Sequence, residues 1–141
     1  MVIDYEGLVR QAFTAREKAY APYSNFMVGS ALLTGEGDVY TGCNIENAAY
    51  SPSNCAERTA FFKAVSEGRR HFVAIAVVGG LRDTKENGFS YAFPCGVCRQ
   101  VMNEFCGEDF VIISAKSPGE YRLCTLKELL PEAFGPANLG R

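Results

Sequence analysis

The sequence predicts an α/β fold with three α-β-α layers, in which helices cover both faces of a five-stranded mixed sheet. Helical and strand-like segments follow one another in the order α-β-β-α-β-α-β-β-α. The later strands alternate with helices, which is typical of chains whose helices pack on both faces of a sheet. The length of 141 residues and the 48% hydrophobic content are enough for one core. We therefore expect a single domain over residues 1–141.

The first half of the chain predicts a helix, a β-hairpin and a second helix. Apolar residues recur at helical spacing over 3–19, before a Pro- and Asn-containing break. Two strand-like segments, 27–34 and 39–44, flank a turn rich in Gly and Asp. Strong helix formers occupy 56–67, and Gly68 is the expected stop.

The second half of the chain predicts three strands and two helices. The apolar run 72–78, rich in Val and Ala, indicates a strand that is buried on both faces. The Gly-, Asp- and Asn-containing segment 79–93 indicates a loop. The remaining expected elements are a helix from 94 to 105, strands at 110–115 and 121–124, and a short helix at 125–130 capped by Thr125.

Charge and composition limit the partners and the compartment. Fourteen basic and sixteen acidic residues give a net charge of −2, and no basic stripe is present, so we do not expect a nucleic-acid partner. No segment approaches the roughly 20 apolar residues of a membrane span, so no membrane partner is expected either. The first residues lack the features of a signal peptide, which predicts a cytoplasmic protein.

Cysteine usage points to metal or redox chemistry. A chain without an export signal rarely uses six cysteines for disulfides. The single histidine, His71, is expected to be a surface or packing residue, and its solitude argues against nucleophilic schemes that need a histidine base. We expect Cys43, Cys106 and Cys124 to be small buried hydrophobic residues.

Three other cysteines form a pattern that suits zinc. Cys55 and Cys95 lie at the starts of two expected helices, where free N–H groups favour thiolate. Cys98 follows three residues after Cys95, so both share one helix face. Zinc bound at about 2.3 Å needs ligand sulfurs roughly 3.8 Å apart, which this spacing allows.

Glu57 favours a catalytic site over the alternatives. A C-x-x-C pair alone is also compatible with a redox pair or with a structural zinc site. The fourth ligand of such a site would come from Cys43, Cys106, Cys124 or His71. Glu57, two residues after Cys55, is instead placed beside an open coordination position. Zinc deaminases as a class combine a non-ligand Glu with a downstream P-C-x-x-C segment.

These motifs resemble those of a known family. The segments TGCNIENAAY (41–50), CAER (55–58) and PCGVCRQV (94–101) look like those of the small homotetrameric cytidine deaminases. The resemblance runs from about residue 21 to 134. It implies a zinc enzyme of pyrimidine salvage, with one Zn²⁺ per subunit, that hydrolyses cytidine and deoxycytidine to uridine and deoxyuridine and releases ammonia. Water and the nucleoside are then its partners.

The resemblance and the residue chemistry together suggest roles for the remaining site residues. Glu57 is expected to shuttle protons between water, N3 of the cytosine ring and the leaving amino group. Arg58 is expected to donate to a ligand thiolate. Asn44 and Glu46 project to the same side of an extended segment and suit sugar hydroxyls, and the resemblance implies the 3′-hydroxyl. Phe26 is expected, by similarity, to offer its face to the pyrimidine.

The resemblance also implies a pocket wall that is shared between subunits. It extends the wall along 44–50, which includes Asn47 and Ala48, and it places Tyr50 and Phe134 at pockets across subunit contacts. A loop over 81–93 that is longer than usual, and a variant segment at 52–54, leave the pocket shape and substrate preference open.

Three rival functions remain at this point. A nucleic-acid-editing deaminase uses the same chemistry but needs a strand-binding surface, which the charge does not favour. A non-catalytic zinc-binding interaction module would bind metal without turnover. A deaminase of another small aminopyrimidine, such as a nucleoside antibiotic, is closer, although Asn44 and Glu46 favour an ordinary nucleoside.

Overall fold

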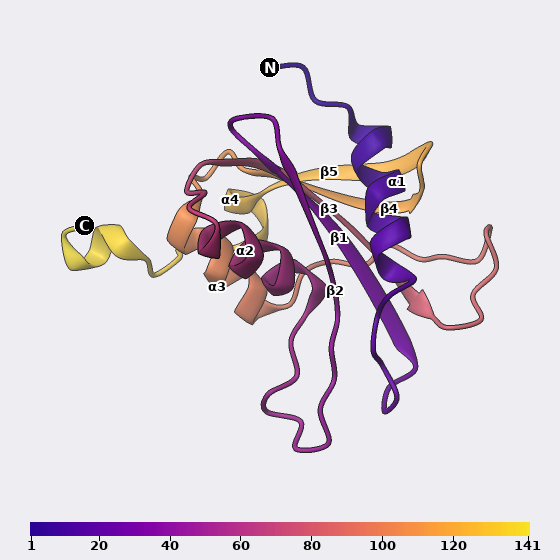
Figure 1. Ribbon diagram of the computed structural model, residues 1–141. Helices are drawn as coiled ribbons and strands as arrows, with labels where there is room; N and C mark the ends of the chain where they lie inside the picture. The colour runs from indigo at the N-terminus through magenta and orange to yellow at the C-terminus, as the bar shows by residue number, and fades with distance from the viewer.

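A computed structural model describes residues 1–141 and contains a five-stranded sheet with helices on both faces, as expected (Figure 1). The strands are β1 (Phe26–Thr34), β2 (Val39–Cys43), β3 (Phe72–Leu81), β4 (Val111–Ser117) and β5 (Glu120–Thr125). The helices are α1 (Tyr5–Arg16), α2 (Ala56–Ser66), α3 (Gly96–Phe105), α4 (Leu126–Leu129) and the 3₁₀ turn η1 (Pro136–Leu139).

The sheet is mixed, which confirms the predicted class. Its strand order is β2-β1-β3-β4-β5. Strands β3 and β4 run parallel, because α3 carries the chain back between them, and all other neighbours are antiparallel. The first and last pairs are hairpins, so β2 and β5 form the two edges.

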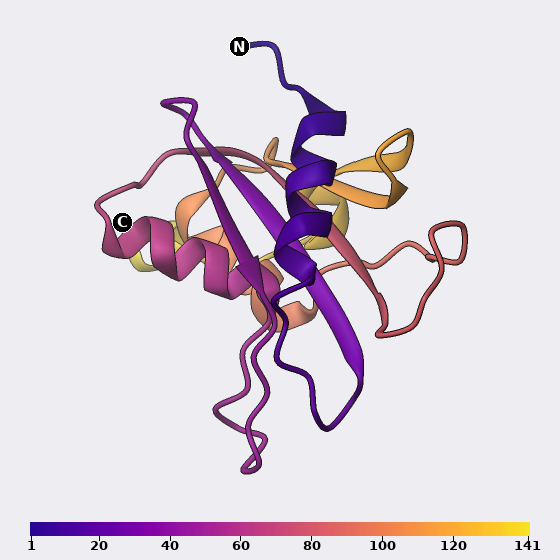
Figure 2. The ribbon, with the colours of Figure 1, turned by 45° about the vertical axis from the view of Figure 1, so that its right-hand side comes forward.

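Two apolar clusters fill the space on the two sides of the sheet. On one side, Leu8, Val9 and Ala12 of α1 pack against Ala31 and Ala74. On the other side, α2 and α3 cover the sheet, and Phe61 and Met102 are fully buried there. Figure 2 shows α1 and α2 on opposite faces. The central strand β3 is buried on both faces from residue 74 to 80, as its apolar run predicts.

Two glycines allow the helices to approach the sheet closely. A Cβ added to Gly29 in β1 would overlap the carbonyl oxygen of Ala12 in α1, and a Cβ added to Gly42 in β2 would overlap that of Ala56 in α2. Because α2 begins at Ala56, its contact with β2 helps to fix the position of the residues that start this helix.

The helix ends follow local hydrogen bonds. Asp4 caps α1 by accepting from the backbone N–H of Gly7 at 3.0 Å. The helix ends at Arg16, not at 19 as expected, because the next three amides bond to carbonyls three residues back and tighten the last turn. Thr125 caps α4 as predicted, in a capping box with Glu128.

Strand β3 is longer than the sequence suggests. The sequence predicts that the strand ends at 78 and that a loop begins at Gly79, because two glycines follow. In the structure Gly79, Gly80 and Leu81 pair with Val28, Met27 and Phe26 of β1, so the loop begins only at 82. The short turn η1 was not predicted, since four residues carry no periodic pattern.

Two long loops and the C-terminus extend away from the sheet. Figure 1 shows segment 44–54 projecting at the bottom, segment 82–95 at the right, and η1 at the far left. No helix has both the length and the apolar character needed to cross a bilayer.

Candidate functional site

Three cysteines meet where two helices begin. Cys55 is the N-cap of α2 and Cys95 is the N-cap of α3, and neither uses its side chain as a cap. Cys98 lies in the first turn of α3 and is buried. Both helices therefore direct the positive ends of their dipoles at the sulfurs, which stabilises thiolate.

The sulfur geometry fits a zinc ion. Cys55 Sγ lies 3.7 Å from Cys95 Sγ, which lies 3.5 Å from Cys98 Sγ. All three sulfurs are within 4.8 Å of one another. Tetrahedral Zn²⁺ with Zn–S bonds of about 2.3 Å separates its sulfurs by roughly 3.8 Å, so these thiolates suit that ion.

No fourth protein ligand joins this group. Cys43, Cys106, Cys124 and His71 do not belong to it, so none of them completes a structural four-ligand site. Three protein ligands leave one position for water, which is the arrangement of catalytic zinc sites.

The cysteines outside the site are less buried than expected. Cys43, Cys106 and Cys124 are partly buried instead of fully buried. Burial raises the pKa of Cys106 to about 12, which matches a role in packing.

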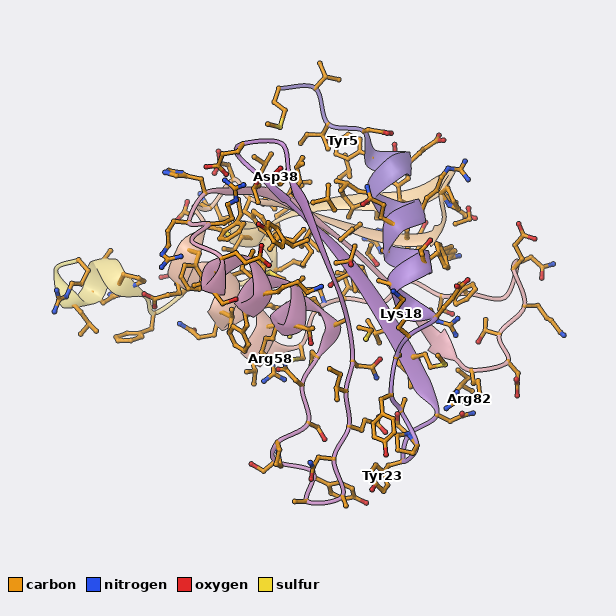
Figure 3. The ribbon with its side chains drawn as sticks, in the orientation of Figure 1. Tyr5, Lys18, Tyr23, Asp38, Arg58 and Arg82 are labelled. Carbon is orange, nitrogen blue, oxygen red and sulfur yellow. The ribbon has the colours of Figure 1, made fainter.

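Arg58 supplies positive charge to the sulfurs. Its Nη2 donates to Cys55 Sγ at 3.1 Å, as the sequence predicts for this arginine. The pKa of Cys55 is lowered to about 5. A hydrogen bond with the Cys98 thiol is the largest cause, and hydrogen bonds with Arg58 and Cys95 contribute less. Arg58 leaves the first turn of α2 on the side of the 44–54 loop (Figure 3).

Glu57 lies beside the cluster and is almost fully buried. Only 4% of its surface is exposed, and no ion pair of the structure includes it. Burial raises the pKa of Glu57 to about 7, well above the ordinary value of a carboxyl group. The side chain nevertheless borders a cavity, so it can reach a bound molecule.

A cavity of about 280 Å³ opens next to the sulfurs. Of the predicted site residues it contains Phe26, Asn44, Glu46, Cys55, Glu57, Arg58 and Cys95 in its walls. Segments far apart in the sequence, from β1, the 44–54 loop, α2 and the 82–95 loop, therefore converge here. The volume is close to the lower end of the range of small-molecule sites, roughly 300 Å³.

Asn44 extends the pairing of β1 and β2 with its side chain. Its Oδ1 accepts from the Val28 amide at 2.8 Å, and its Nδ2 donates to the Phe26 carbonyl at 2.8 Å. The amide thereby fixes the wall of the cavity that carries Phe26. Each end of the amide keeps one further hydrogen-bonding position free for a ligand.

Glu46 is held by the segment that precedes β1. Its carboxylate accepts from the backbone amides of Tyr23 at 2.9 Å and Ser24 at 3.1 Å, and from the Ser24 hydroxyl. The hydrogen bonds from Ser24, then that from Tyr23, hold the pKa of Glu46 below its usual range. An ionised carboxylate at the cavity wall can accept further hydrogen bonds from hydroxyl groups.

Four predicted substrate-binding residues lie outside this cavity. Asn47 shapes its own turn, accepting from the Ala49 amide at 2.9 Å, and Ala48 is exposed. Tyr50 is 71% exposed and contacts Tyr23 edge-on, near the tip of the projecting loop. Phe134 is 61% exposed in the C-terminal segment, where its carbonyl accepts from Gln100 and Asn103.

The cavity also contains residues that the sequence analysis did not name. Four of them had no individual role but belong to the two segments that left the pocket shape open: Ser53 and Asn54 to segment 52–54, and Ala92 and Phe93 to the loop 81–93. Both segments precede expected ligand cysteines in the sequence. Val28, Ala56 and Val77 come from strands and a helix start whose pairing no local pattern reveals.

Comparison with known proteins gives a consistent result. A family model described as the cytidine and deoxycytidylate deaminase zinc-binding region matches residues 3–114. The chain is 50% identical to the cytidine deaminase of Sporosarcina psychrophila, over 97% of this chain and 96% of that protein. It is 52% identical to the cytidine deaminase of Halalkalibacterium halodurans, over 94% and 95%.

Solved structures agree in fold and in sequence. The crystal structure of cytidine deaminase from Burkholderia pseudomallei aligns with a TM-score of 0.83 and 46% identity, over 95% of this chain and 100% of that one. That of cytidine deaminase from Mycobacterium tuberculosis aligns with a TM-score of 0.78 and 38% identity, over 95% and 99%.

Proposed function

Because the chain belongs to the cytidine and deoxycytidylate deaminase family, we propose that it hydrolyses cytidine and deoxycytidine to uridine and deoxyuridine and releases ammonia. One observation carries this proposal: a buried carboxyl group, Glu57, shares a small cavity with a three-sulfur zinc site. A carboxyl group beside an open zinc position is the equipment for hydrolysis, whereas a purely structural zinc site has no use for it.

Cys55, Cys95 and Cys98 hold the zinc ion in this proposal. The ion would supply the acidity that makes a water molecule nucleophilic at neutral pH. Three thiolates on a dication leave the group with one net negative charge, which weakens that acidity. The hydrogen bond from Arg58 to Cys55 withdraws charge from a ligand sulfur and offsets this effect.

Glu57 moves the protons of the reaction. It takes a proton from the attacking water and delivers it to N3 of the cytosine ring. The water oxygen meanwhile bonds to C4. Glu57 then takes the remaining proton of that oxygen, now the hydroxyl on C4, and delivers it to the amino nitrogen, so the C4–N bond breaks, ammonia leaves and C4 becomes a carbonyl carbon. Burial in the first turn of α2 keeps competing water away from this carboxyl group.

Phe26, Asn44 and Glu46 orient the nucleoside. The exposed part of the Phe26 ring offers a face to the pyrimidine. The second Nδ2 hydrogen of Asn44 and the ionised Glu46 carboxylate suit the 3′-hydroxyl of the sugar, as donor and acceptor.

The pocket is completed in a homotetramer, in which Asn47, Ala48, Tyr50 and Phe134 act at contacts between subunits. The exposure of Tyr50 and Phe134 on projecting segments supports this assignment. All six cysteines are free, which suits a reducing compartment such as the cytoplasm and a role in pyrimidine salvage.

The test is conversion of cytidine to uridine, followed by absorbance, with zinc measured in the same preparation. We expect turnover with one zinc ion per subunit, and loss of both zinc and activity in Cys55→Ala. Zinc-loaded, folded protein that leaves cytidine and deoxycytidine unchanged would refute the proposal. Turnover by zinc-free protein would refute the role of the metal.

A further inference from the structure

Phe93 is an aromatic residue at the cavity that has no role in the proposed proton transfers, zinc binding or sugar binding. It lies two residues before Cys95, in the loop between β3 and α3, and it borders the cavity beside the sulfurs. The ring is 38% exposed, so part of its surface is available to a bound molecule.

The loop segment that carries Phe93 is attached to the sheet. The buried hydroxyl of Ser114 in β4 donates to the carbonyl of Ala92 at 2.7 Å. Ala92 and the Phe26 ring both lie close to Gly79 of β3, because a Cβ built on that residue would be 3.0 Å from Phe26 Cε1 and 3.3 Å from Ala92 Cβ. The end of the loop therefore adjoins the side of the cavity that carries Phe26.

Arg122 of β5 makes cation–π contacts with two aromatic rings of this segment. Its Cζ lies 5.5 Å from the ring centroid of Phe93 and 5.5 Å from that of Tyr91, within the range of cation–π attraction. Arg122 pairs with Ser114 across the β4–β5 hairpin, so the two side chains share one face of the sheet and reach the same segment.

No carboxylate competes for Arg122. None of the ion pairs of the structure includes it. Lys116 of β4 lies 4.8 Å from the Tyr91 ring and has no such contact with Phe93. Lys116 also lies 4.0 Å from a carboxylate oxygen of Glu120. The difference that an experiment can use is that Arg122 reaches the cavity-lining ring and Lys116 does not.

We propose that Phe93 is a wall residue that contacts the pyrimidine of the bound nucleoside, and that Arg122 is a positioning residue that acts through Phe93. This inference rests on the proposed function. An aromatic side chain two residues before a ligand cysteine lies close to the reacting end of the base, where it removes apolar ring surface from water. Arg122 limits the directions that the Phe93 ring adopts.

Steady-state kinetics with cytidine test the first half. In Phe93→Ala we expect KM to rise roughly 5- to 20-fold from lost apolar and aromatic contact, while kcat changes by less than about threefold. Zinc content and the circular dichroism spectrum should match the wild type. Phe93→Leu keeps apolar surface without a ring and should give an intermediate KM, which also covers the case in which Phe93→Ala does not fold.

A double-variant cycle tests the second half. Arg122→Ala should raise KM roughly 2- to 5-fold, and Arg122→Lys, which keeps the cation, should recover part of this loss. In a Phe93→Ala background, Arg122→Ala should have no further effect on KM, because its target is gone. Lys116→Ala is the matched control and should leave KM unchanged.

Several results would overturn the inference while the proposed function stands. One is active wild-type protein whose KM is unchanged in both Phe93 variants. Another is an Arg122→Ala effect that is equally large with and without Phe93, or equally large in Lys116→Ala, since a general structural role would produce it. Failure of zinc-loaded wild type to deaminate cytidine would instead count against the proposed function itself.

Discussion

At the scale of single residues, the site separates two kinds of charge. Arg58 faces the sulfurs and donates to Cys55, whereas Glu57, its neighbour in sequence, is buried toward the cavity without an ion-pair partner. Successive residues in the first turn of a helix project in different directions, so one turn of α2 can serve both the metal and the substrate.

Replacing Glu57 tests proton transfer with little change in shape. Glu57→Gln keeps the size and the hydrogen-bonding ends but cannot carry the proton, so we expect kcat to fall by roughly 10²- to 10⁴-fold. Zinc content and melting temperature should stay near wild-type values. Glu67→Gln, at the exposed end of the same helix, is the control. Normal turnover in Glu57→Gln would eliminate the shuttle assignment.

The crowded surroundings of Gly79 lead to a second prediction about a single residue. A methyl group there would press on the Phe26 ring, on Val28 Cγ2 and on Ala92 Cβ, all at 3.0 to 3.3 Å. We expect Gly79→Ala to displace the ring, to raise KM for cytidine and to cost roughly 1 to 3 kcal/mol of unfolding free energy. Kinetics and urea denaturation measure the two effects. Gly119→Ala, where nothing lies within 4 Å of the added carbon, should change neither.

At the scale of elements, the site forms because the starts of two helices and the ends of two neighbouring strands lie close together. Strand β1 begins at the cavity with Phe26 and Val28, which pair with Leu81 and Gly79 at the end of β3. Helices α2 and α3 begin beside the same cavity with their N-cap cysteines. Arg99 stabilises the start of α3. Its Nε donates to the Pro94 carbonyl at 2.7 Å, and its Nη1 donates to that of Leu129 at 2.6 Å.

Arg16 connects α1 to the same strand ends. Its side chain donates to the carbonyls of Met27, Gly80 and Leu81 at 2.7 to 2.9 Å, and only 9% of the residue is exposed. Arg16→Met keeps apolar volume but leaves these acceptors without their donor, so we expect a loss of roughly 2 to 4 kcal/mol in unfolding free energy.

Urea denaturation measures the effect of Arg16→Met. Arg10→Met, on the exposed face of the same helix, should change stability by less than about 0.5 kcal/mol, because its ion pair with Glu6 is solvent-exposed. Equal stability of the two variants would show that the bonds from Arg16 do not hold the strand ends.

At the scale of the whole molecule, local patterns predicted most of the architecture. Capping residues, helix periodicity and the apolar run of β3 are short-range signals, and the helices and strands that they predicted are present. The three sulfurs were also predictable, because two of the ligands share one helical turn and the third starts another helix.

Long-range pairing accounts for what the sequence could not reveal. Gly79 and Gly80 indicate a loop by composition, yet antiparallel pairing with β1 keeps them in the strand. The approach of Arg122 to Phe93 depends on the register of β4 and β5 and on the bond between Ser114 and Ala92. Neither the pairing of the two glycines nor the approach of Arg122 to Phe93 can be predicted from the local sequence pattern.

The assembly yields the last prediction, because Glu57 lies in the cavity of its own chain while Phe134 is exposed on a segment that leads away from the body. If Phe134 serves a neighbouring subunit, mixed tetramers of Glu57→Gln and Phe134→Ala chains contain pockets in which both side chains are intact. Equal co-expression under two affinity tags should then restore activity in about a quarter of the pockets, well above either variant alone.

Tandem purification and cytidine turnover measure this recovery, and sedimentation should give four chains. Mixed tetramers no more active than the better parent, or a fully active monomer, would place Phe134 outside any shared pocket.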